Sequence, residues 1–172
     1  MLERYRLAEG ALSRLFHELC PYNTDIESVL LKVSTLNDFY STNIYDTYSV
    51  GKHILQLNID ARLAADDLSL VNQIANVSIK GKVRKFYSFA TKYCSHHRPD
   101  TFPIYDSFVE KMLKQYRKVD KFESFRNEEL KDYQRFIEIV ERLREFYGLN
   151  QFTLRELDIF LWLAGKESFP NY

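Results

Sequence analysis

Apolar residues recur every three or four positions along most of the chain, which is the spacing of one face of an α-helix. The clearest stripe contains Phe136, Val140, Leu143 and Tyr147, and Gly148 after it is a predicted helix end. Shorter stripes with the same spacing occupy residues 12–19, 26–36, 50–57, 70–74 and 157–164. The pattern predicts roughly seven to nine helices and no strand, so the expected class is a compact, multi-helix, all-α fold.

Two predicted helix starts carry the capping-box pattern, in which a hydroxyl side chain precedes a glutamate by three residues. Ser107 with Glu110 forms one of them, and Thr153 with Glu156 forms the other. Because Ser107 and Glu110 satisfy the first helix, Asp106 just before it has no necessary structural task. An aspartate at a helix start is most often an N-cap, however, and this alternative stays open for Asp106.

The composition is typical of a packed globular protein. Of the 172 residues, 45% are hydrophobic and 15% aromatic, and the 5 glycines and 4 prolines are few, which favours long helices over a turn-rich β fold. We therefore expect one domain over residues 1–172. The two cysteines, Cys20 and Cys94, form neither a disulfide framework nor a metal quartet, so a reducing compartment is expected and no metal or cofactor.

No segment reaches the roughly 18 consecutive apolar residues of a membrane span. The N-terminus is charged and lacks the apolar centre of a signal peptide. The sequence therefore predicts a cytoplasmic protein that does not interact with a membrane.

The charges are unevenly distributed, although 24 basic and 24 acidic residues give a formal net charge of zero. Residues 80–121 contain eleven basic and four acidic residues, a net charge of +7, and the rest of the chain carries −7. Residues 68–99 contain no acidic residue. A basic middle in a neutral protein predicts one face that meets an anion such as a phosphate backbone, whereas the plainer interpretation is a lysine-rich solvated face.

The basic stretch begins with the sequence IKGKVRK at residues 79–85, between two segments with helical spacing. We interpret it as a tight hinge between two helices. Backbone N–H groups and a helix N-terminus meet at such a hinge and favour a bound phosphate. The predicted phosphate ligands are Lys80, Gly81, Lys82 and Arg84.

The order of these segments resembles the helix-hairpin-helix DNA glycosylase superfamily over roughly residues 30–165. In that family a hairpin of the type L-P-G-V-G-x-K leads into a helix, and a later loop presents P-V-D-T-H-V, whose aspartate is catalytic. Gly81 aligns with the first hairpin glycine, Lys85 with the nucleophilic lysine of bifunctional members, and Asp106 in the sequence PIYDS with the aspartate. Val83 replaces the second glycine, and one more residue separates the proline from the aspartate.

The resemblance implies a helix-hairpin-helix-like unit that cleaves a modified or damaged base from duplex DNA. Asp106 would stabilise the positive charge that develops on the sugar, and Lys85 would attack the anomeric carbon as an amine. The extruded base would enter a pocket of aromatic and amide side chains. The predicted members of this pocket are Asn37, Tyr40, Asn43, Tyr45 and Tyr105. No four-cysteine pattern follows the domain, so no iron–sulfur cluster is expected.

Two other interpretations stay open. A non-catalytic derivative of the same fold would bind nucleic acid or a protein partner through the basic hinge, and Lys85 would then be an exposed helix lysine. A helical interaction domain with no nucleic-acid role is the third interpretation. His96 and His97 are interpreted as loop residues near the phosphate site, because adjacent histidines do not share one metal unaided.

Overall fold

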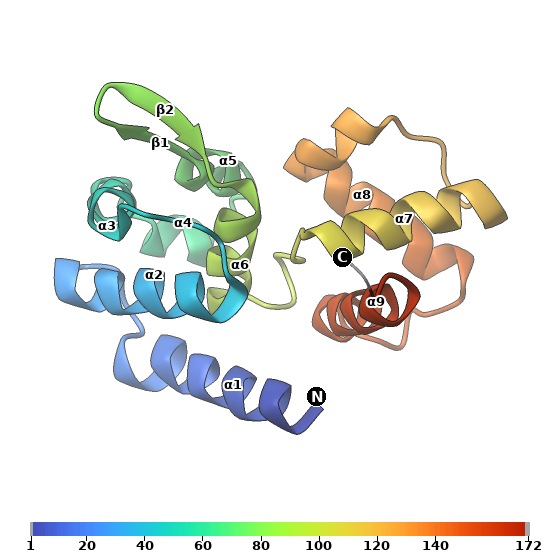
Figure 1. The fold of residues 1–172 in the computed structure, drawn as a ribbon, viewed down its shortest axis with the longest axis horizontal. Coiled ribbons are helices and arrows are strands. Elements are labelled where there is room, and N and C mark those ends of the chain that lie inside the picture. The colour runs from blue at the N-terminus through green and yellow to red at the C-terminus, as the bar shows by residue number, and fades with distance from the viewer. Residues whose placement is uncertain (1, 171–172) are drawn as a thin grey trace. The chain divides into compact units, whose positions relative to one another are not determined.

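The structure is a computed structural model that describes residues 2–170, and the chain in it divides into two compact units (Figure 1). Unit 1 is Met1–Arg98 and unit 2 is Pro99–Tyr172. Each unit contains its own set of buried apolar side chains. The expectation of one domain over residues 1–172 stays a prediction.

Unit 1 is mostly helical and carries one small antiparallel sheet. Its elements, in chain order, are α1 (Leu2–Arg14), the π-helical turn η1 (Leu15–Leu19), α2 (Ile26–Tyr40), α3 (Thr47–Gln56), α4 (Asp60–Ala64), α5 (Ser69–Ala75), β1 (Asn76–Ile79), β2 (Lys82–Lys85) and α6 (Tyr87–His97). Unit 2 is helical throughout its regular elements. These are α7 (Ser107–Asp120), the 3-10 turn η2 (Asn127–Lys131), α8 (Tyr133–Phe146) and α9 (Leu154–Ser168).

The helical spacing of the sequence correctly predicts most of these elements. Phe136 and Val140 of the clearest stripe are buried on α8. Gly148 after this helix has a φ of +65°, as a left-handed helix end requires. Thr153 and Glu156 form the predicted capping box at the start of α9. The mostly helical class is therefore confirmed.

The prediction of no strand is wrong. β1 and β2 pair antiparallel, with Val77 opposite Arg84 and Ile79 opposite Lys82, and they form a hairpin between α5 and α6. The helix predicted to follow the hinge directly begins only at Tyr87. A signal was available in the sequence, because Val77 and Ile79 alternate with polar residues just before a glycine, and this is the pattern of a strand that ends in a tight turn.

The hairpin is attached to unit 1 mainly through its first strand. Val77 of β1 is buried, and α3 packs against β1. At the base of the hairpin, the Phe86 N–H donates to the Ala75 carbonyl over 2.8 Å. All four residues of β2 are exposed. The second strand, drawn in green in Figure 1, therefore presents its side chains to solvent.

In unit 2 the loop before α7 is fixed to α8 and α9. The buried Asp158 carboxylate of α9 accepts the Ile104 N–H over 2.8 Å. The Tyr133 hydroxyl of α8 donates to the Pro103 carbonyl over 2.9 Å. These two bonds set the position of the chain just before Asp106.

Candidate nucleic-acid interface

The turn between β1 and β2 consists of Lys80 and Gly81, whose φ angles are both positive, +49° and +74°. A two-residue loop of type I′ requires positive φ at both positions, because its twist matches the twist of the flanking strands. Glycine adopts this conformation without strain, and lysine does so at a small cost. Lys80 and Gly81 therefore form a tight β-turn between two strands, and the hinge between two helices that the sequence predicts at this point is not found.

Four cations gather on this turn and on the second strand. Lys80, Lys82, Arg84 and Lys85 are all exposed. Throughout residues 2–170, none of these four side chains forms an ion pair with a carboxylate. The predicted phosphate ligands therefore lie together on one exposed ribbon, which we call the basic hairpin (residues 76–85).

The start of α3 lies beside the turn of the basic hairpin. Asp46 caps α3 by accepting the Ser49 N–H over 3.0 Å. This hydrogen bond is the main cause that lowers the pKa of Asp46, and the nearby charge of Lys80 adds to the effect. Tyr45, directly before the cap, is 98% exposed. Tyr45 thus directly precedes the residue on which the charge of Lys80 acts.

Three other predicted base-pocket residues of unit 1 lie on or after α2. Asn37 holds the following loop, because its side chain donates to the Ile44 carbonyl over 3.0 Å and accepts the Ile44 N–H over 2.9 Å. The Tyr40 hydroxyl donates to Glu9 over 2.9 Å. Asn43 is exposed, with a φ of +57°. Asn37 and Tyr40 thus have structural partners, and a role of these residues in a base pocket stays a prediction.

Asp106 is the N-cap of α7, which corrects the assignment of that cap to Ser107 and Glu110. Its Oδ1 accepts the N–H groups of Phe108 and Val109, both over 2.9 Å. A carboxylate takes the cap in place of a hydroxyl because its negative charge is also stabilised by the helix dipole. The side chain is half-buried, and its Oδ2 accepts no hydrogen bond from the described part of the chain.

Tyr105, the fifth predicted base-pocket residue, belongs to the core of unit 2. Its ring packs edge-on against Phe136 at 5.6 Å between centroids, and its hydroxyl donates to Glu110. Glu110 also accepts a hydrogen bond from Lys114. Desolvation raises the pKa of Glu110, but these two hydrogen bonds outweigh it, and the pKa lies below its usual range. Glu110 therefore serves this cluster and not the helix cap.

The two predicted catalytic residues belong to different units, Lys85 to unit 1 and Asp106 to unit 2. Lys85 lies on a strand and not on a helix as predicted, with its Nζ 5.6 Å from the centroid of the Tyr87 ring. A lyase mechanism needs the amine and the carboxylate at the same sugar. The proximity of these two side chains stays a prediction.

Unit 1 also contains a buried polar network that the sequence does not reveal. Asn23 is at its centre, and its Nδ2 donates to Asp60 over 2.5 Å and lies 3.2 Å from Nε2 of His97. Its Oδ1 accepts from Nζ of Lys32 and from the Tyr93 hydroxyl, both over 2.6 Å. Asn23 and His97 are 74 residues apart, so no local pattern marks the network.

Burial governs the titration of this network. It lowers the pKa of Lys32 to about 8, although the charge of Asp60 opposes the shift. Burial also lowers the pKa of His97 well below its usual range. His96 and His97 end α6 and pack against Phe16 at 5.3 and 4.9 Å between ring centroids, which corrects their interpretation as loop residues near a phosphate. The network joins α2, α4 and α6.

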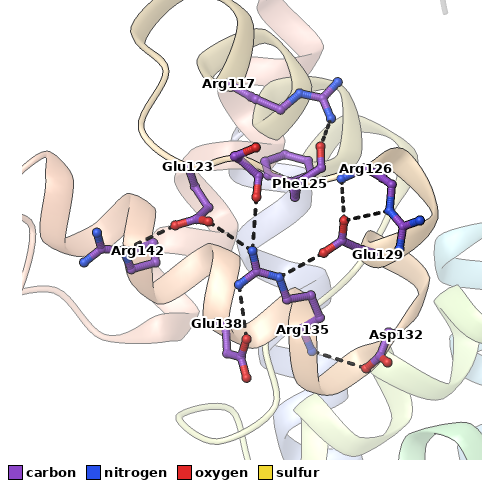
Figure 2. A network of polar contacts seen from close by, with 10 residues as sticks. Arg117, Glu123, Phe125, Arg126, Glu129, Asp132, Arg135, Glu138 and Arg142 are labelled. Carbon is purple, nitrogen blue, oxygen red and sulfur yellow. Dashed lines mark hydrogen bonds and ion pairs between the residues drawn. The ribbon is translucent and has the colours of Figure 1, made fainter.

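Several arginines of unit 2 are held by carboxylates (Figure 2). Arg135 on α8 donates to Glu123 over 3.0 Å, to Glu129 over 3.2 Å and to Glu138 over 3.1 Å. Arg142, two turns further on, also contacts Glu123, over 3.4 Å. We call this set the arginine network (residues 123–145). Its cations are already neutralised and are poor candidates for phosphate contacts.

A pocket of about 390 Å³ beside α9 is lined by apolar side chains and Glu156, which is already bonded to the Thr153 N–H over 2.8 Å. Residues 2–170 contain no group of three or more His, Cys, Asp or Glu side chains that could hold a metal ion. Over the same residues, no helix combines the length and the apolar character needed to cross a membrane.

Comparisons with known proteins place the chain in a family. The family described as HI_0787_N, N-terminal domain, matches residues 1–101, which include all of unit 1. The chain is also 48% identical over 150 residues to an uncharacterized protein of Haemophilus influenzae, an alignment that covers 87% of this chain and 72% of the relative. No solved structure matches. The chain therefore belongs to the HI_0787_N family, whose N-terminal domain it carries at residues 1–101.

Proposed function

We propose that the protein binds DNA through the basic hairpin and performs no chemistry on it. The observation that carries the proposal is the cluster of four exposed cations within residues 80–85, none of which is paired with a carboxylate in the described chain. Cations of this kind neutralise phosphates and release counterions, which supplies most of the affinity of non-specific DNA binding. A two-stranded ribbon also fits the width of the major groove.

The positions of the predicted catalytic residues support binding without catalysis. Asp106 has a structural task, because its Oδ1 caps α7. Lys85 stands on the exposed strand β2, beside Tyr87 and among other cations. The positions of Asp106 and Lys85 are thus explained without a catalytic role for either residue.

The proposal is tested by fluorescence anisotropy with a labelled duplex of about 20 base pairs, or two helical turns. We expect K80E/K82E to weaken binding at least about tenfold and to reduce the slope of log affinity against log salt by about two, since each lost phosphate contact removes about one. The matched control is R126E/R142E, which changes the net charge by the same amount on the exposed side of the arginine network.

An unchanged affinity in K80E/K82E would contradict the proposal. An equal loss in both double variants would also contradict it, because binding would then follow net charge and not the position of the basic hairpin. Circular dichroism of all variants checks that the fold is retained.

A DNA glycosylase or glycosylase/lyase, as the superfamily resemblance implies, is the second candidate function. One observation favours it, because Asp106 opens a helix just after a Pro-containing loop and its Oδ2 accepts no hydrogen bond from residues 2–170. Asparagine caps helices as well as aspartate does, so D106N keeps the fold and removes only the charge. Base release from a panel of damaged duplexes by the wild type, lost in D106N, would support catalysis. No release from any lesion would leave DNA binding alone.

A further inference from the structure

Tyr45 is exposed to an unusual degree. Its exposed fraction of 98% exceeds that of every other large hydrophobic side chain in the described part of the chain. Burying a tyrosine ring removes about 150–250 Å² from water, so a fully solvated ring forgoes a substantial stabilisation. A single exposed aromatic residue is common on protein surfaces, however, and its surroundings decide whether it has a function.

Lysine charges act on the residues that follow Tyr45 at the start of α3. Tyr45 directly precedes the Asp46 cap of α3, and α3 packs against strand β1 of the basic hairpin. Tyr48, in the first turn of α3, is 57% exposed, and Nζ of Lys52 lies 5.6 Å from its ring centroid. Two exposed tyrosines therefore stand at the start of α3, where the charge of Lys80 acts on Asp46.

The backbone that carries Tyr45 is fixed on both sides. Ile44 before it is buried, and both its N–H and its carbonyl are bonded to the Asn37 side chain. Asp46 after it is held by hydrogen bonds from the Ser49 N–H over 3.0 Å and the Ser49 hydroxyl over 2.8 Å. A rigid loop with a solvated aromatic ring pays little entropy when a flat group binds to that ring.

We infer that the basic hairpin binds a single-stranded nucleic acid, with phosphates on Lys80 and Lys82 and an unpaired base stacked on Tyr45. The inference rests on the proposed function, because the hairpin supplies the charge that attracts the strand. Within a duplex both faces of a base are covered by neighbouring bases, so a surface tyrosine stacks only where a base is unpaired. Aromatic rings interleaved with cations are typical of single-strand binding, and each stacked base contributes about 1–3 kcal/mol.

Asp46 adds one negative charge to this surface. Its Oδ1 accepts the Ser49 N–H and its Oδ2 accepts the Ser49 hydroxyl, so both oxygens are engaged within the α3 cap. The charge of Lys80 acts on the same carboxyl. Against four hairpin cations and Lys52, the surface keeps a positive balance that suits a polyanion.

The test compares the affinity of the full chain for oligothymidylate and oligouridylate of about 12 nucleotides with its affinity for a duplex. We expect the single strands to bind more tightly than the duplex. Y45A should weaken single-strand binding about tenfold, within the range of one lost stacking contact, and leave duplex binding unchanged. Y45F, which keeps the ring, should bind like the wild type.

The matched control is Y22A, because Tyr22 is also an exposed tyrosine of unit 1, at 66%, and belongs to the connection between η1 and α2. Figure 1 shows this connection apart from the hairpin. We expect Y22A to bind like the wild type. Since Tyr45 makes almost no contact with the rest of the chain, Y45A should fold normally.

A Y45A variant that binds single strands like the wild type, or a wild type that prefers the duplex, would overturn the inference. The proposed function would survive either result, because charge reversal in the hairpin tests it separately on a duplex. No binding to any of the three probes would overturn both. The ratio of the thymidylate and uridylate affinities distinguishes DNA from RNA as the source of the strand, and either source supports the inference.

Discussion

The basic hairpin of unit 1 and the arginine network of unit 2 both concentrate positive charge, but they place it differently. In the hairpin, Lys82 and Arg84 are exposed on β2, and neither is paired with a carboxylate in the described chain. In the network, Arg135 contacts three glutamates at 3.0–3.2 Å, and only 27% of its side chain is exposed. An excess of basic residues therefore indicates an anion-binding surface only where their charges are unpaired.

The basic segment of residues 80–121 also contains both paired and unpaired cations. Residues 80–121 carry a net charge of +7, but they include part of each unit. In α7, Lys114 is paired with Glu110, and Arg117 donates to the Phe125 carbonyl over 2.5 Å. The positive charge left unpaired in residues 80–121 is therefore smaller than the count of basic residues indicates. Within residues 80–85, by contrast, none of the four cations forms an ion pair with a carboxylate of the described chain.

The largest expected effect on stability is that of R135A. The change removes hydrogen bonds to three carboxylates, two of which are partly buried, and leaves those negative charges close together, so the free energy of unfolding should fall by about 2 kcal/mol. Urea denaturation of the wild type and of R135A measures this change in the free energy of unfolding. K82A in the basic hairpin is the control and should change stability by less than about 0.5 kcal/mol. Equal losses of unfolding free energy in R135A and K82A would show that the paired arginine stabilises the fold no more than an exposed hairpin lysine does.

Lys32 is a third case, because it is buried and, within the described residues, hydrogen-bonded to oxygens that are not carboxylates. Lys32 has a pKa of about 8 in the folded state and about 10.5 when unfolded. Between these values the folded protein has lost the proton that the unfolded chain keeps, so folding releases a proton and stability rises with pH. Below pH 8 both states are protonated and Lys32 contributes no pH dependence.

We therefore expect the free energy of unfolding of the wild type to rise by about 1–2 kcal/mol from pH 8 to pH 10, relative to the Lys32→Met variant. Denaturation curves for both proteins across this range measure the difference. Parallel pH profiles would show that Lys32 is not desolvated in the folded state.

The smallest expected effect is that of K82Q at low salt. Lys82 lies among Lys80, Arg84 and Lys85, and like charges at this spacing repel each other. Removing one charge should raise the melting temperature by about 1–2 °C, and the gain should vanish at high ionic strength because salt screens the repulsion. A lower melting temperature in K82Q would show that the lysine stabilises the hairpin.

The helix caps illustrate how far sequence patterns reach. The pattern of Thr153 and Glu156 correctly predicts the box at α9. The same pattern at Ser107 and Glu110 fails, because Asp106 one residue earlier is the better acceptor and its loop is fixed by tertiary bonds. A sequence pattern therefore identifies candidate cap residues, and the tertiary position of the chain before the helix determines which of them forms the cap.

The hairpin illustrates a different limit. Val77 and Ile79 alternate with polar residues, but four-residue strands give a weak signal beside long helical stripes. A hinge between helices at Gly81 is expected from the helical spacing on both sides, and the resemblance to a helix-hairpin-helix unit agrees with it. The burial of Val77 next to α3 fixes β1, and β2 completes the backbone hydrogen bonds that β1 would otherwise leave unpaired.

The sequence alone determined the mostly helical class, the buried stripes and the position of the four hairpin cations, because helical spacing and charge are local properties of the chain. The tertiary structure decided which charges are unpaired, which carboxylate caps α7 and which polar groups are buried. These properties depend on contacts between distant segments, such as the bonds of Asn23 to Asp60 and His97, and no local pattern encodes them.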